Sequence, residues 1–159
     1  MKKVLWVFSL LLSFIYADTT LCGKDDMVIL SCDIKKKKLS ICKQDNQKVV
    51  YKYGTLNKIE LEINTVPWIS SEQFIRANYE EHLRFHNKGY DYIVYANEFL
   101  VYDRHPNDGT QHYVEHHGVY VVKNKKLLVK LTCNKIYPHM KGFGKVGNGA
   151  RKENYIGYY

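Results

Sequence analysis

The chain lacks the short motifs that mark the common enzyme classes. It contains no G-x-S-x-G nucleophile elbow, and no glycine-rich phosphate loop lies between a strand and a helix. Its cysteines never approach the C-x-x-C spacing that is typical of structural zinc sites. We therefore predict a protein that is not an enzyme, with no catalytic residue, no cofactor-binding residue and no metal ligand.

The chain also lacks a second long apolar segment. The one that it has, residues 4–15, follows two lysines and is too short to span a bilayer comfortably. Ala17 then supplies the small residue that precedes a signal-peptide cleavage site. We predict that residues 1–17 are a secretory signal peptide, that the mature chain is periplasmic or secreted, and that no transmembrane segment remains after cleavage. The mature chain has 142 residues, enough for one domain, and its formal net charge is +6 instead of +8.

Four cysteines are present, and all of them lie in the mature part. An even number of cysteines in a small exported chain predicts two disulfides. Cys22, Cys32, Cys42 and Cys133 allow three pairings. A hairpin centred on Lys37 would place Cys32 opposite Cys42 and leave Cys22 with Cys133. Side-chain alternation instead turns Cys32 and Cys133 toward the core, which favours a long-range bridge between the first hairpins and the last core strand.

Alternation of apolar and charged residues is the main structural signal. Residues 58–63 alternate strictly, so Ile59, Leu61 and Ile63 share one face, as in a half-buried strand. Similar runs recur along the chain and are joined mostly by short turns, which brings the expected number of strands to about eight. Residues 81–96 are predicted to form a hairpin whose second strand, from Tyr90, is apolar or aromatic on both faces and therefore central. We predict an all-β fold, either a small antiparallel barrel or a two-sheet sandwich.

This β domain is expected to cover residues 18–136. Ser71 could cap one short helix at residues 70–79, and an irregular loop is the alternative there. Residues 137–159 form a tail rich in glycine, lysine and tyrosine, which we expect to be mobile or loosely docked.

The histidines are the obvious candidates for metal chemistry. Pairs such as His112 and His116 would share a face of a helix, but on a strand they lie about 13 Å apart, too far to bind one metal ion. We therefore expect exposed histidines, and likewise solvated carboxylates at Glu80 and Glu81. A metal-binding protein or metal-dependent hydrolase that uses histidines of residues 82–117 remains an alternative. The seven histidines are His82, His86, His105, His112, His116, His117 and His139.

Several short motifs, centred on the cysteines and on paired tyrosines, have a familiar spacing. They are Leu21-Cys22, Ser31-Cys32, Ile41-Cys42, Tyr51-Lys52-Tyr53-Gly54, Ile59-Glu60-Leu61, Phe85, Asn87, Gly89-Tyr90-Asp91-Tyr92, Val94-Tyr95, Gly118-Val119 and Leu131-Thr132-Cys133. Over residues 21–134 the chain thus resembles a family of small exported bacterial proteins of uncharacterised function. The resemblance implies an exported β domain with four cysteines and carries over no catalytic residue. The chain departs from the family in a longer histidine-rich segment at residues 98–117 and in the tail.

A non-enzymatic binding module is the leading functional hypothesis. We expect the partner surface to include Tyr90, Tyr92, Arg104, His112 and His116. The partner would be an unknown protein or an anionic envelope or glycan component, and not a nucleic acid. Two alternatives are an inhibitor of lysozyme-like enzymes and a protein that binds anionic surfaces, the second because the chain is basic.

Overall fold

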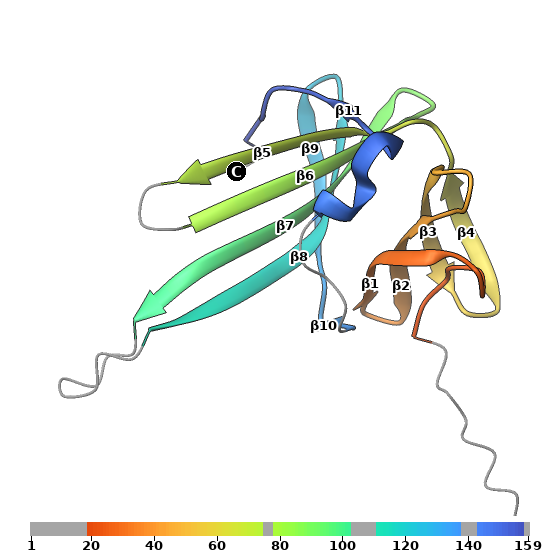
Figure 1. Cartoon of the computed structure of the whole chain (residues 1–159), viewed down its shortest axis with the longest axis horizontal. Helices are drawn as coiled ribbons and strands as arrows, with labels where there is room; N and C mark the ends of the chain where they lie inside the picture. The colour runs from red at the N-terminus through yellow and green to blue at the C-terminus, as the bar shows by residue number, and fades with distance from the viewer. Residues whose placement is uncertain (1–18, 75–77, 103–110, 138–142, 158–159) are drawn as a thin grey trace, which may run out of the picture.

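The computed structural model describes residues 19–74, 78–102, 111–137 and 143–157, which form two β-sheets and one 3₁₀ helix (Figure 1). The first sheet has the order β10-β1-β2-β3-β4, and the second has the order β11-β5-β6-β7-β8-β9. Every pairing is antiparallel except that of β11 with β5. No helix in these residues is long and apolar enough to cross a membrane. The all-β, two-sheet prediction is confirmed, whereas the alternative of a closed barrel is wrong.

The strands of the first sheet are β1 (Met27–Ile34), β2 (Lys37–Lys43), β3 (Val49–Thr55), β4 (Lys58–Ile63) and β10 (Lys135–Ile136). Those of the second sheet are β5 (Trp68–Phe74), β6 (Asn78–Asn87), β7 (Tyr90–Tyr102), β8 (Gln111–Lys123), β9 (Lys126–Thr132) and β11 (Arg151–Lys152). The 3₁₀ helix η1 spans Phe143–Gly149. The described residues thus hold eleven strands, more than the eight or so that we expected. The strands that we did not expect are β5 and the two short strands β10 and β11.

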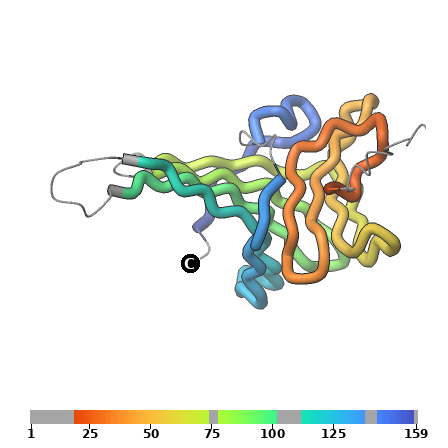
Figure 2. Tube along the Cα trace, turned by 90° about the horizontal axis from the view of Figure 1, so that it is seen from below, coloured from red at the N-terminus to blue at the C-terminus, as the bar shows by residue number. Residues whose placement is uncertain are grey.

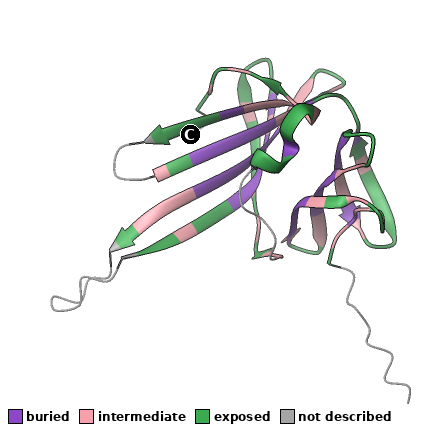
Figure 3. Ribbon diagram, viewed as in Figure 1, coloured by how far each residue is buried: buried purple, intermediate pink, exposed green. Residues whose placement is uncertain are grey.

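The main core lies between the two sheets, where the buried parts of the strands face each other (Figure 3). Period-two alternation places every second side chain in this layer, as the sequence pattern predicts. The core residues from the first sheet include Ile29, Leu30, Ile34, Leu39, Ile41, Val49, Tyr51 and Ile63. Those from the second sheet include Leu83, Phe85, Val94, Ala96 and Val119.

The second sheet is also buried on its other face, near its centre. Tyr95 and Tyr120 stack there with ring centroids 4.4 Å apart, and Ile93 and Val122 complete the cluster. Gly118 lies against Tyr95 so closely that a Cβ atom would lie 2.5 Å from the Tyr95 Oη. The strand that begins at Tyr90 is therefore central and covered on both faces, as its continuous apolar sequence predicts.

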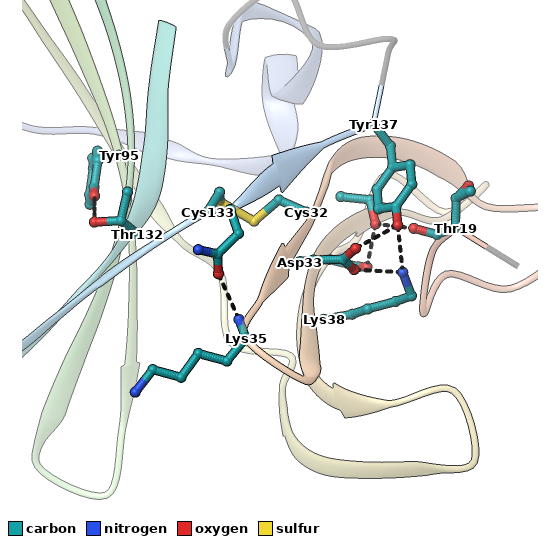
Figure 4. Close-up of a disulfide and its surroundings, with 12 residues drawn as sticks. Thr19, Cys32, Asp33, Lys35, Lys38, Tyr95, Thr132, Cys133 and Tyr137 are labelled. Atoms are coloured by element: carbon teal, nitrogen blue, oxygen red, sulfur yellow. Dashed lines mark hydrogen bonds and ion pairs between the residues drawn. A yellow bond between two sulfur atoms is a disulfide. The ribbon is translucent and has the colours of Figure 1, made fainter.

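Two disulfides join the cysteines as Cys22–Cys42 and Cys32–Cys133 (Figure 4). The long-range alternative is confirmed, and the pairing of Cys32 with Cys42 is wrong. The hairpin turns at Lys35 rather than at Lys37, so Cys32 lies opposite Leu39 across the strands. The Cys32–Cys133 bridge covalently ties the first sheet to the end of β9 in the second.

A polar cluster lies close to this bridge, at the end of β1 (Figure 4). Tyr137 donates its hydroxyl hydrogen to Asp33 at 2.6 Å, and the Lys38 ammonium lies 2.7 Å from the same carboxylate. Burial alone would raise the pKa of Asp33, but the hydrogen bonds from Lys38 and Tyr137 outweigh it and hold this pKa below its usual value. These contacts fasten the segment that follows Cys133 to the first sheet.

The short helix considered for residues 70–79 is not present in the described residues of that segment, and neither is the irregular loop that was its alternative. Residues 68–74 are strand β5, which pairs with β6 from Trp68 opposite Arg84 to Phe74 opposite Asn78. Ser71, the candidate cap, is therefore an exposed strand residue opposite Glu81, and its neighbour Ser70 is buried. Pairing of this segment with β6 has overridden the local helix-capping signal. Such pairing depends on tertiary structure and cannot be inferred from the local sequence.

The expectation of a loosely attached tail is wrong for residues 143–157. Phe143 and Val146 of η1 are fully buried in the main core, and η1 contacts both β1 and β6. The Phe143 amide donates a hydrogen bond to the Glu81 carboxylate at 2.6 Å. Farther along, the Glu153 carboxylate accepts hydrogen bonds from the Arg84 guanidinium, one of them at 3.0 Å. The C-terminal segment thus closes one side of the sandwich.

Candidate functional site

The hairpin of β7 and β8 extends beyond the sandwich (Figures 1 and 2). Both strands have 13 residues, and β6 pairs with β7 only as far as Tyr79 opposite Glu98. Beyond that pair the only strand that pairs with β7 in the described residues is β8, up to Tyr102 opposite Gln111, and β6 adds a hydrogen bond from the Leu100 amide to the Asn78 side chain at 3.3 Å. We call residues 98–102 and 111–116 the arm.

The arm carries apolar and aromatic side chains on both faces. Leu100 and Tyr113 are register partners on one face, and 55% of Tyr113 is exposed. On the other face Val101 is 37% exposed, and the Phe99 ring lies 5.8 Å from His116 in an edge-on arrangement. A two-stranded ribbon is marginally stable by itself in water, so this arm is a surface whose apolar groups gain stability from further burial.

The arm unites only part of the surface expected from the sequence. His112 and His116 lie on it and are exposed, but Tyr90 and Tyr92 lie at the opposite end of β7. Tyr92 is partly buried and packs against Tyr51 of the main core, with ring centroids 5.7 Å apart. His116 lies opposite Asn97, seven residues from Tyr90, which places the two groups about 23 Å apart along the strand. Arg104 lies outside the described residues.

Two histidines that we expected to be exposed, His82 and His117, are instead buried. The His82 ring bonds to the Glu80 carboxylate through Nε2, and the Tyr155 ring stacks on it with centroids 4.7 Å apart. Glu80 and Glu81 are buried as well, so the expectation of solvated carboxylates is wrong for both. These polar side chains of β6 are buried because residues of the C-terminal segment pack over them. The sequence around β6 gives no sign of that packing.

The other histidines of the described residues do not converge either, and His105 and His139 lie outside those residues. His86 bonds to Asp91 at 2.8 Å, far from the arm. Across the described parts of the chain, no group of three or more His, Cys, Asp or Glu side chains is arranged to hold a metal ion. The geometry therefore offers no support for the metal-dependent alternative.

His117 lies at the base of the arm, and only 4% of it is exposed. Its Nδ1 atom forms no hydrogen bond within the described residues. Burial, with a smaller contribution from the neighbouring His116, lowers the pKa of His117 to about 4. His117 is thus neutral in the folded protein under conditions in which an unfolded histidine is charged.

The buried His117 predicts that stability falls in mild acid. Its pKa is lower in the folded than in the unfolded chain, so its contribution is complete above pH 6.5 and is lost as the pH falls toward 4. We expect this group alone to remove about 3 kcal/mol from the free energy of unfolding over that range. Urea unfolding of the protein and of His117→Gln at several pH values measures the difference.

A matched control is His116→Gln, which changes an exposed histidine on the same strand. That variant should keep most of the acid-dependent loss, whereas His117→Gln should lack it. Superimposable pH profiles for wild type and His117→Gln would show that His117 is not the buried titrating group.

Comparison of the chain with protein-family models, with curated proteins and with solved structures finds no match. The arm is therefore the best candidate site on geometric grounds alone. Sequence reasoning did indicate the segment at residues 98–117. It missed that the segment projects from the fold, although the uninterrupted apolar run from Phe99 to Val101 opposite Tyr113 and Val114 was a usable signal.

Proposed function

We propose that this protein is an exported, non-enzymatic binding module that docks a protein partner through the arm. The single observation that carries the proposal is a paired ribbon that exposes Tyr113 on one face and Val101 on the other and leaves its other described apolar side chains only half-buried. The two disulfides are compatible with an oxidising compartment such as the periplasm or the extracellular space.

The composition of the arm favours a protein over an anionic lipid or glycan. Its residues include tyrosine, phenylalanine and histidine, with two glutamates and no lysine or arginine. Aromatic side chains are enriched at the centres of protein interfaces. Glu98 and Glu115 lie opposite each other and make the arm locally acidic, so the matching surface would be apolar with a basic border.

Site-specific photo-cross-linking tests this proposal. A benzoylphenylalanine in place of the exposed Tyr113 is expected to capture one discrete protein from the compartment in which the chain is found. Leu100→Asp in the same molecule should abolish that product, because Leu100 is the register partner of Tyr113 and the substitution places a charge beside it on the same apolar face. The readout is the mass and identity of the cross-linked product.

The matched control places the same photoreactive group at Leu128, which is 48% exposed and lies on β9 near the β8–β9 turn, at the end of the second sheet opposite to the arm. We expect this position to give no such product. The same set of products from both positions, no product from Tyr113, or a product with twice the mass of the chain would each overturn the proposal.

A further inference from the structure

Two hairpin turns lie at the end of the second sheet opposite to the arm. One joins β6 to β7 through Lys88 and Gly89, and the other joins β8 to β9 through Asn124 and Lys125. Because Asp91 pairs with Val122, both turns leave the sheet at the same end, about two strand spacings or 10 Å apart. Their exposed lysines form what we call the lysine end, which consists of Lys88, Lys123, Lys125 and Lys126.

The charges of the lysine end are not neutralised by neighbours. None of its four lysines forms an ion pair with any described residue. Lys123 instead donates a hydrogen bond to the Tyr90 hydroxyl at 3.3 Å. Asp91, the acid on the adjoining strand, is engaged by Arg84 at 3.3 Å and His86 at 2.8 Å. The two turns are separated by about the Debye screening length at physiological salt. Because salt does not fully screen charges at that separation, the lysines act together as one positive surface.

The backbone at these turns is one that lysine adopts at a cost. Lys88 and Lys125 have φ values of 51° and 63°, in the left-handed region that disfavours residues with a Cβ atom. Both central residues of each turn have positive φ, as in a type I′ turn, where Asn-Gly is the preferred pair. Each turn has one member of that pair, Gly89 in the first and Asn124 in the second, with lysine in the other place. The fold itself gains nothing from these two lysines.

Charge is also segregated along the second sheet. At the arm end, Glu72 of β5, Glu98 of β7 and Glu115 of β8 are exposed or half-exposed. At the other end the exposed charge is mainly that of the lysines. A negatively charged surface would therefore attract the lysine end and repel the described residues of the arm end.

From these observations we infer that the lysine end binds an anionic lipid bilayer and directs the arm away from it. Turn tips that leave the sheet together suit a flat charged surface. All four cations are lysines, which act as point charges toward diffuse negative charge, whereas bidentate recognition of a single phosphate favours arginine. Val66 is 50% exposed. Its neighbour Thr65 donates a hydrogen bond to the His86 carbonyl, which places Val66 near the lysine end, where it adds an apolar contact.

The test uses a double variant, Lys88→Asn with Lys125→Gly, which gives both turns the preferred Asn-Gly pair. We expect its thermal midpoint to be unchanged or higher, because the left-handed positions are relieved. Its partition coefficient onto vesicles of phosphatidylcholine with phosphatidylglycerol should fall about 25-fold, or about fivefold for each lysine. Wild-type binding should be lost on vesicles of phosphatidylcholine alone and should weaken as salt is added.

The matched control is Lys35→Asn with Lys36→Gln in the β1–β2 turn. It removes the same charge, and Lys35 also has a positive φ of 56°, but it lies near Asn134 at the other end of β9. This control should bind the anionic vesicles within about twofold of wild type. An equal loss in both double variants would show a response to net charge alone and overturn the inference. So would binding to heparin without binding to vesicles, or no difference between the first double variant and wild type.

Discussion

Replacing Cys32 and Cys133 together by alanine is expected to lower the free energy of unfolding by about 4–5 kcal/mol. The two residues are 101 positions apart, so their bridge restricts the unfolded chain far more than a local bridge does. It also links β1 of the first sheet to the end of β9 in the second. Urea unfolding under non-reducing conditions measures the change, which is large enough to unfold much of the protein at 37 °C if its overall stability is ordinary.

The second disulfide supplies the matched control. Cys22 and Cys42 are 20 positions apart, and the same loop-closure argument gives a loss of about 3 kcal/mol when both are replaced by alanine. The order of the two losses is the informative result. If the Cys22–Cys42 pair proved the more important, the cross-sheet bridge would not be the main constraint on the unfolded chain.

Phe143→Ala is expected to lower the free energy of unfolding by about 3–5 kcal/mol, the usual cost of removing a fully buried phenylalanine. Its ring has no exposed surface and lies in the core between the sheets. The cavity left behind would adjoin the buried Glu81 carboxylate, which the Phe143 amide now bonds. Chemical denaturation measures the loss.

Ile156→Ala is the control, because Ile156 belongs to the same C-terminal segment but is 52% exposed. We expect it to change the free energy of unfolding by less than about 0.5 kcal/mol. Equal, small effects of both substitutions would mean that the C-terminal segment does not contribute to the core.

Regular strands were predictable wherever alternation is local and complete. The strand at Lys58–Ile63 coincides with the predicted segment, and the β6–β7 hairpin includes the predicted residues 81–96. Both have a strict or continuous apolar pattern and a turn of one or two residues such as Lys88-Gly89, so neighbouring residues contain the necessary information. The disulfide pairing was predictable only as one of three alternatives, because it depends on where the first hairpin turns.

What the sequence could not predict depends on contacts between distant segments. β5 forms because β6 offers a partner strand, and the burial of Glu81 depends on η1, 62 residues away. Likewise His82 is covered by Tyr155 from the C-terminal segment. The candidate site shows the same division. Of its residues the sequence indicated only His112 and His116, whereas the exposure of the apolar side chains follows from where β6 stops pairing with β7.

Mass spectrometry of the protein recovered from outside the cytoplasm of the cells that make it tests the central claim most directly. We propose that the protein is an exported domain held together by two disulfides. We therefore predict a mature chain beginning at Asp18, with non-reduced peptides linked as Cys22–Cys42 and Cys32–Cys133. Recovery of the chain only from the cytoplasm, with its signal segment intact and four free thiols, would contradict it.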